Sequence, residues 1–171
     1  LNGLDSLASI GSNLYIGFNA NLLTLSGAPM LRQIGGNYVI TLNRVLQSLT
    51  GIEPENIGGD LEVNRNESLT SLTGLESVVT VGRNLYVIHN EMLRSLNGLQ
   101  NLRTVEGEFE ITDNEKLTVI DQLDSLETVS VGLSIHDSWS LEAIEALPRL
   151  QRVGYLNIRN NLILQRIGSL P

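Results

Sequence analysis

A repeat of 23 or 24 residues runs through the chain and restricts its fold more than any other feature. Seven segments share one pattern, and they start at residues 14, 38, 61, 85, 109, 133 and 156. The shared pattern is L-x-I-x-x-N-x-x-L-x-x-L-x-G-L-x-x-L-x-x-V-G, and the segments LEVNRNESLTSL and LYVIHNEMLRSL follow its first half. In-phase copies of this length are typical of solenoids, in which each copy forms one turn that stacks on its neighbours.

The spacing of apolar residues predicts short strands and bends. Leu14 and Ile16 alternate with a period of two, so both side chains should point into the core from one strand. The leucines that follow in each turn recur at every third residue, which suits one inward side chain per tight turn. We therefore predict an all-β solenoid over residues 1–171, a right-handed single-domain β-helix of about seven leucine-rich turns. Each turn should bury about six aliphatic side chains.

An asparagine recurs at the end of each predicted strand, where backbone groups need partners. An inward amide carries both donors and an acceptor, so it can satisfy them and bond to the next turn. We predict that this column is a structural ladder and that the sequon at Asn66 is buried and unmodified. The ladder consists of Asn19, Asn43, Asn66, Asn90, Asn114 and Asn161, with Ser138 in the sixth copy.

A glycine column follows the leucines, and it suits a positive φ or a close approach between turns. Its members are Gly3, Gly27, Gly51, Gly74 and Gly98. Gln122 and Ala146 take this place in the later copies, so either a positive φ is not obligatory there or the last turns bend differently.

Composition excludes several classes of function. The net charge of −8 argues against nucleic acid, whose phosphates require a basic surface. The chain has no cysteine, which removes disulfides and thiol chemistry. No run of 18 apolar residues occurs, so we expect no direct membrane insertion. We expect no cofactor.

Two groups of polar residues are candidates for metal binding. His89 and His136 lie in neighbouring columns beside Asp113 and Asp137, which allows either a His–carboxylate metal pair or solvated side chains. Stacked turns would place a column of glutamates about 5 Å apart, and calcium or splaying into water would relieve their repulsion. The glutamate column is Glu67, Glu91 and Glu115.

The side chains that should point outward from the strands vary from turn to turn, as a binding surface does. Apolar and aromatic side chains occur in the first turns, and acidic ones follow. Exposed apolar groups of this kind usually mark contacts, and an acidic border can steer a basic partner. The predicted ligand-binding residues are Tyr15, Phe18, Val39, Leu42, Tyr86 and Trp139. The acidic border is Glu62, Glu110, Asp113 and Asp137.

The repeated pattern resembles that of the receptor L-domain family, most closely over residues 61–99. That family is a leucine-rich right-handed β-helix found in the ligand-binding ectodomains of growth-factor and insulin-type receptors, and in fungal cell-wall proteins. The resemblance implies an extracellular or cell-surface location and a surface for partners. Receptor members usually have disulfide-bonded ends, so the lack of cysteine here indicates a microbial relative.

We therefore expect a non-catalytic recognition or adhesion module that binds protein or glycan ligands through the outward strand face. The alternatives are a structural spacer that self-associates through uncapped ends, and a glycan-active enzyme that uses Glu62 and Glu110. The chain begins at Leu1 within a turn, so we expect it to be a segment of a longer protein.

Overall fold

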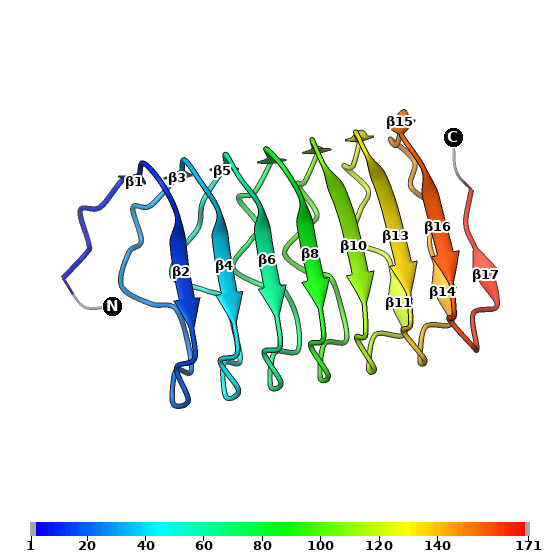
Figure 1. The fold of residues 1–171 in the computed structure, drawn as a ribbon, viewed down its shortest axis with the longest axis horizontal. Helices are drawn as coiled ribbons and strands as arrows, with labels where there is room; N and C mark the ends of the chain where they lie inside the picture. Colours follow the sequence, from blue (N-terminus) through cyan, green and yellow to red (C-terminus); the bar gives the residue numbers. More distant parts are fainter. Residues whose placement is uncertain (1–2, 170–171) are drawn as a thin grey trace.

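A computed structural model describes residues 3–169 as an all-β solenoid of about seven turns. Figure 1 shows the turns side by side, with the N-terminal turn at one end of the row and the C-terminal turn at the other. All strand pairing is parallel, which follows from stacking one copy of the repeat on the next. Between residues 3 and 169 there is no helix with the length and apolarity that a membrane crossing needs.

The largest sheet contains one strand from each turn. Its order along the solenoid is β2-β4-β6-β8-β10-β13-β16. The bounds are β2 (Leu14–Gly17), β4 (Tyr38–Thr41), β6 (Leu61–Asn64), β8 (Leu85–Ile88), β10 (Glu108–Thr112), β13 (Gly132–His136) and β16 (Leu156–Arg159). Equivalent residues of the repeat pair with each other, so the period of the sequence fixes the register.

Two smaller sheets complete the turns. The second sheet contains β1 (Ser9–Ile10), β3 (Gln33–Ile34), β5 (Asn56–Ile57), β7 (Thr80–Val81), β9 (Thr104–Val105), β12 (Thr128–Val129) and β15 (Arg152–Val153). The third sheet contains β11 (Val119–Ile120), β14 (Ala143–Ile144) and β17 (Arg166–Ile167). The third sheet begins in the turn where Gln122 replaces the glycine of the column. The bend of the later turns therefore differs, which is one of the two alternatives that the sequence leaves open.

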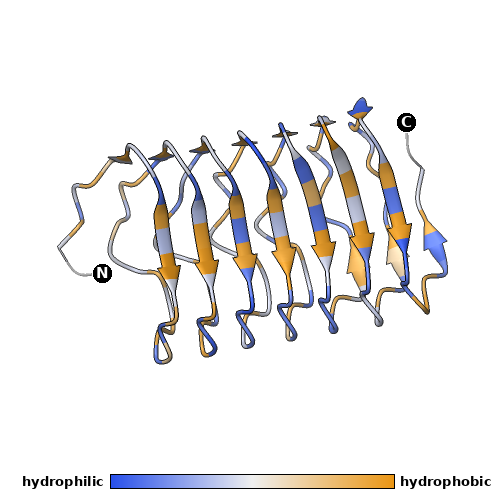
Figure 2. Ribbon diagram, viewed as in Figure 1, coloured by the Kyte–Doolittle hydropathy of each residue, from blue (hydrophilic) through white to orange (hydrophobic). Residues whose placement is uncertain are grey.

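The core is one aliphatic column along the solenoid axis. In β6 the side chains alternate between buried and half-buried, and Figure 2 shows this alternation as bands along the strand. The turn that starts at β6 buries seven aliphatic side chains rather than the six expected, because the valine between the leucines and β7 also points inward. These side chains are Leu61, Val63, Leu69, Leu72, Leu75, Val78 and Val81.

The residue after each strand of the large sheet adopts a left-handed conformation. This column has φ between 53° and 60°, and it contains Phe18, Leu42, Arg65, His89, Asp113, Asp137 and Asn160. The sequence prediction that Phe18 and Leu42 are outward strand residues is therefore wrong, since β2 ends at Gly17 and β4 at Thr41. The left-handed residue turns the chain so that the following asparagine points inward.

The glycine column also has positive φ, as predicted. Its φ values lie between 95° and 128°. An added Cβ at Gly98 would lie 2.0 Å from the carbonyl oxygen of Leu72 in the preceding turn. Glycine is therefore required both by the backbone conformation and by the close approach of the turns.

Candidate binding surface

Two columns of side chains point outward from the large sheet and define the candidate binding surface, which we call the outer face. The first column is Tyr15, Val39, Glu62, Tyr86, Glu110, Ser134 and Asn157. The second column is Gly17, Thr41, Asn64, Ile88, Thr112, His136 and Arg159. The first column matches the sequence prediction. The second column differs from the sequence prediction, which put the column of Phe18 on the strands. The structure places that column in the bend.

The asparagine ladder supports one edge of the outer face. Asn43, Asn66, Asn90 and Asn114 are fully buried, as the sequence predicts. The Oδ1 atom of Asn90 accepts a hydrogen bond from the backbone N of Asn66 at 3.1 Å, and its Nδ2 donates to the carbonyl of Val63 at 2.9 Å. Asn19 is exposed and Asn161 is half-buried in the outermost turns. The ladder fixes the spacing of the strands beneath the candidate surface.

A second ladder supports the opposite edge, and sequence reasoning missed it. The backbone N of Asn37 donates to Asn13 Oδ1 at 2.8 Å, and that of Asp60 donates to Asn37 Oδ1 at 2.9 Å. Asn84 and Glu108 continue the series. The signal was available, because an amide or carboxyl side chain immediately precedes β2, β4, β6 and β8 of the large sheet. Both edges of the face are therefore held by side-chain-to-backbone bonds.

The apolar end of the outer face lies over the first two turns. Tyr15 and Phe18 are 57% and 71% exposed, whereas Val39 and Leu42 are half-buried. A Cβ added at Gly17 would lie 2.6 Å from the Tyr15 ring, so the glycine leaves room for the ring to lie over the strand. Phe18 and Leu42 line a shallow hollow of about 280 Å³ with Ala20 and Arg44. The structure thus brings four predicted ligand-binding residues together.

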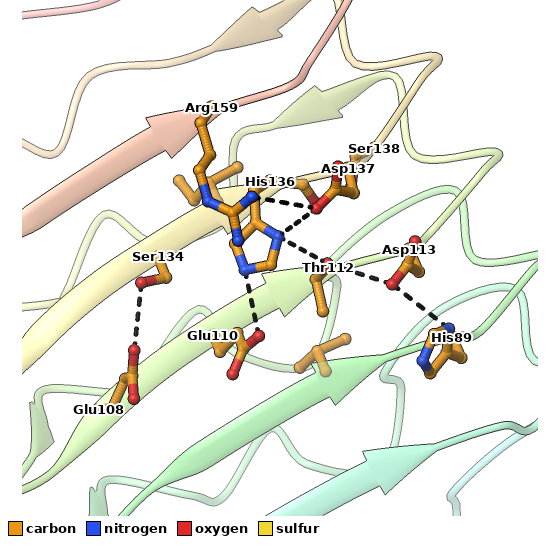
Figure 3. Close-up of polar contacts among 12 residues, drawn as sticks. His89, Glu108, Glu110, Thr112, Asp113, Ser134, His136, Asp137, Ser138 and Arg159 are labelled. Atoms are coloured by element: carbon orange, nitrogen blue, oxygen red, sulfur yellow. Dashed lines mark hydrogen bonds and ion pairs between the residues drawn. The ribbon is translucent and has the colours of Figure 1, made fainter.

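A histidine network occupies the other half of the face (Figure 3). The ring of His136 contacts a carboxylate at each nitrogen, with Nε2 3.1 Å from Glu110 Oε1 and Nδ1 2.7 Å from Asp137 Oδ2. Arg159 Nη1 lies 3.7 Å from the same Asp137 oxygen. The hydrogen bond from His136, followed by one from Asn160, lowers the pKa of the Asp137 carboxyl. The network therefore joins β10, β13 and β16.

Threonine, histidine and glutamate are close enough in this network to be compared with a catalytic triad. Thr112 Oγ1 lies 3.0 Å from His136 Nδ1. However, only 4% of Thr112 is exposed, and Asp137 contacts the same ring nitrogen. A nucleophile must reach its substrate, so this arrangement fits a supporting hydrogen-bond network better than a reaction centre.

A concentration of negative charge surrounds Tyr86 in the centre of the outer face. Glu62 and Glu110 are its register partners on the two neighbouring strands. Partial burial and then the charges of Asp60, Glu108, Glu110 and Glu62 raise the pKa of the Tyr86 phenol. The phenol of Tyr155 donates a hydrogen bond to Glu108, and this bond raises the pKa of Tyr155. Tyr86 therefore stays neutral within an acidic field.

The remaining sequence candidates lie outside the two columns of this surface. Glu67 Oε1 lies 3.2 Å from Arg44 Nε, whereas Glu91 and Glu115 are exposed. No group of three or more histidine or acidic side chains in the described part of the chain is arranged to hold a metal ion. Asp113 Oδ2 lies 3.4 Å from His89 Nδ1. Trp139 is 60% exposed beside Ser138, which takes the place of a ladder asparagine.

The fold and the outer face define the chain as a leucine-rich β-solenoid with one uncovered parallel sheet. No protein-family model matches the chain, and neither a curated protein nor a solved structure matches it.

Proposed function

We propose that this chain is a non-catalytic extracellular recognition or adhesion module that binds a protein or glycan ligand through the outer face. The observation that carries the proposal is a seven-stranded sheet that no described segment covers (Figure 1), with Tyr15 exposed on the sheet and Phe18 exposed in the bend at its edge. Figure 1 shows no described segment crossing in front of this sheet. Exposed apolar groups on a rigid scaffold are a common signature of an interface.

The chemistry of the polar half supports binding rather than catalysis. The carboxylates of Glu110 and Asp137 contact His136, and the one hydroxyl beside its ring is buried. The repeat pattern supports a relation to the receptor L-domain family in a form without cysteine. On this proposal the outer face corresponds to a ligand-binding surface, and the extracellular location follows from the same relation.

Binding can be tested with printed glycan arrays and peptide arrays probed by the purified chain and by Tyr15→Ser with Phe18→Ser. We expect the double variant to lose the signal while its melting temperature changes by only a few degrees, because both rings are exposed. The matched control is Leu23→Ser with Met30→Ser, which removes side chains of 54% and 59% exposure away from the outer face. Equal signals for all three proteins would contradict the proposal.

A role as a structural spacer or assembly unit is the second candidate. Leu162, Ile163 and Ile167 in the last described turn are 78%, 45% and 48% exposed. Side chains of this type favour burial against another surface. Sedimentation velocity over a range of concentrations would detect such association, and Leu162→Ser with Ile163→Ser should abolish it.

A further inference from the structure

We propose that the partner of the outer face is an extended protein segment that carries lysine or arginine about four residues from an apolar side chain. This inference depends on the proposed function and specifies its ligand class. Two separate features of the face support it: the acidic centre around Tyr86 and the apolar end formed by Tyr15 and Phe18.

The acidic centre consists of carboxylates on two strands, β6 and β10, with an aromatic ring on β8 between them. Glu62 on β6, Tyr86 on β8 and Glu110 on β10 are in register. Strand spacing places neighbouring members of this row about 4.8 Å apart. Glu108 belongs to the same group, because its charge acts on the Tyr86 phenol. A cation above Tyr86 would therefore contact carboxylates on both sides.

In the part of the chain that the structure describes, these carboxylates have no lysine or arginine partner, and Glu110 contacts only the His136 ring among the basic side chains. Among the described residues, no lysine or arginine nitrogen lies within 4.0 Å of the carboxylates of Glu62, Glu108 or Glu110. The Glu62 carboxylate contacts Asn64 Nδ2 at 3.0 Å. The Glu108 carboxylate contacts Ser134 Oγ at 3.1 Å and the Tyr155 hydroxyl, and the Glu110 carboxylate contacts the His136 ring. In contrast, Glu67 and Glu127 each contact an arginine at 3.2 and 2.8 Å. The outer face therefore offers uncompensated negative charge to a partner.

Tyr86 makes this charge selective for a cation with an organic side chain. The phenol is only half-buried, so its ring is accessible from the outer face. A lysine or arginine group over a tyrosine ring gains cation–π attraction in addition to its ion pairs. A neutral glycan would gain neither of these contributions, and an anionic glycan would be repelled.

The apolar end sets the length of the partner segment. Tyr15 and Tyr86 occupy the same column three turns apart, which corresponds to about 14 Å along the solenoid at the usual strand spacing. An extended chain covers about 3.3 Å per residue, so about four residues span this interval. A segment that crosses the strands can thus place an apolar side chain at Tyr15 and a basic one at Tyr86.

The test uses NMR titration of the isotope-labelled chain with an eight-residue peptide that has two leucines at one end and two lysines at the other, separated by serines. We expect amide shifts in β2, β4, β6, β8 and β10. In Glu62→Gln with Glu110→Gln the affinity should fall roughly five- to tenfold, because two ion pairs on a partly exposed surface are lost. The control, Glu115→Gln with Glu142→Gln, removes the same charge at exposed positions elsewhere, and its affinity should change less than twofold.

Three results would overturn the inference. The first is equal affinity in the wild type and in Glu62→Gln with Glu110→Gln, and the second is an equal loss in the control variant. The third is binding of a peptide with glutamate in place of lysine. If cellohexaose shifts the same amides and the basic peptide does not, the outer face binds ligands as proposed but the basic partner is wrong. If Tyr15→Ser with Phe18→Ser keeps the full signal on the arrays, the proposed function itself is contradicted.

Discussion

Asn90 shows how one side chain closes a turn of the solenoid. Its Oδ1 accepts from the backbone N of Asn66 in one neighbouring turn, while its own backbone N donates to Asn114 Oδ1 in the other. Its Nδ2 donates to the carbonyls of Val63 and Ile88. Because Asn90 is fully buried, water cannot replace these bonds.

Replacing Asn90 with alanine should therefore lower the free energy of unfolding by roughly 1–3 kcal/mol, since buried backbone groups lose their partners. Glu91→Ala is the matched control, because Glu91 is the next residue and is exposed. It should change stability by less than about 0.5 kcal/mol. Urea denaturation followed by circular dichroism measures both. Equal stability of the two variants would show that the ladder contributes little.

Tyr38 is a residue-scale exception in the core. It takes a position that leucine holds in most other turns, and it is fully buried. Its hydroxyl has no hydrogen-bond partner among the described residues. Burial raises the pKa of the Tyr38 phenol, because the charged form cannot be solvated in the core.

Tyr38→Phe should therefore stabilise the chain by roughly 1 kcal/mol or more, since it removes an unsatisfied polar group and keeps the ring. The pH dependence should change as well. A phenol whose pKa is raised by folding lowers stability as the pH rises above the ordinary tyrosine value of about 10. The loss of stability at alkaline pH should thus be smaller in Tyr38→Phe than in the wild type. Urea melts at pH 8 and pH 11 test this, and a destabilised variant at both pH values would contradict it.

At the scale of the element, each turn that keeps the glycine column depends on two backbone positions with positive φ. One follows the strand of the large sheet, and side chains as different as Phe18 and Asp137 occupy it. The other is the glycine column, where the preceding turn approaches closely as well. The first position accepts any residue at some cost in strain, whereas the second excludes a side chain through contact with backbone atoms.

Gly98→Ala should consequently destabilise the chain by more than about 1 kcal/mol, because alanine is strained at φ 118° and its Cβ would meet the Leu72 carbonyl. Gly11→Ala provides the comparison, since no atom lies within 4 Å of its added Cβ and its φ is not positive. It should be close to neutral. Thermal melts of both variants measure the difference, and a neutral Gly98→Ala would disprove the steric argument.

The elements could be predicted because the core repeats, whereas parts of the surface could not. Leucine, asparagine and glycine columns recur through most of the turns, so the strands, the Asn66 ladder position and the Gly98 bend follow from the sequence. Phe18 was misplaced because the predicted strand was extended one residue too far, into the left-handed bend. The network around His136 joins side chains from three strands, and its contacts depend on rotamers that no periodicity reveals.

At the scale of the whole molecule, stability comes from contacts between neighbouring turns. The central turns bury their aliphatic side chains completely, and β8 pairs with a strand on each side. Among the described strands, β2 and β16 occupy the two edges of the large sheet. Leu156 in β16 is 38% exposed, although the equivalent Leu133 and Leu85 are fully buried. Stability should thus decrease from the centre toward both ends, as in other solenoids with nearest-neighbour interactions.

Native-state hydrogen exchange can measure this gradient in the chain of 171 residues. Amides of β6, β8 and β10 should open only in global unfolding, whereas those of β2 and β16 should open locally and show protection at least roughly tenfold lower. Asn90→Ala should reduce the protection of the central strands toward that of the edges, because it breaks the ladder between Asn66 and Asn114. Equal protection of all seven strands would mean that the solenoid unfolds as one unit. The outer face would then present its apolar end and its acidic centre on a scaffold of uniform rigidity.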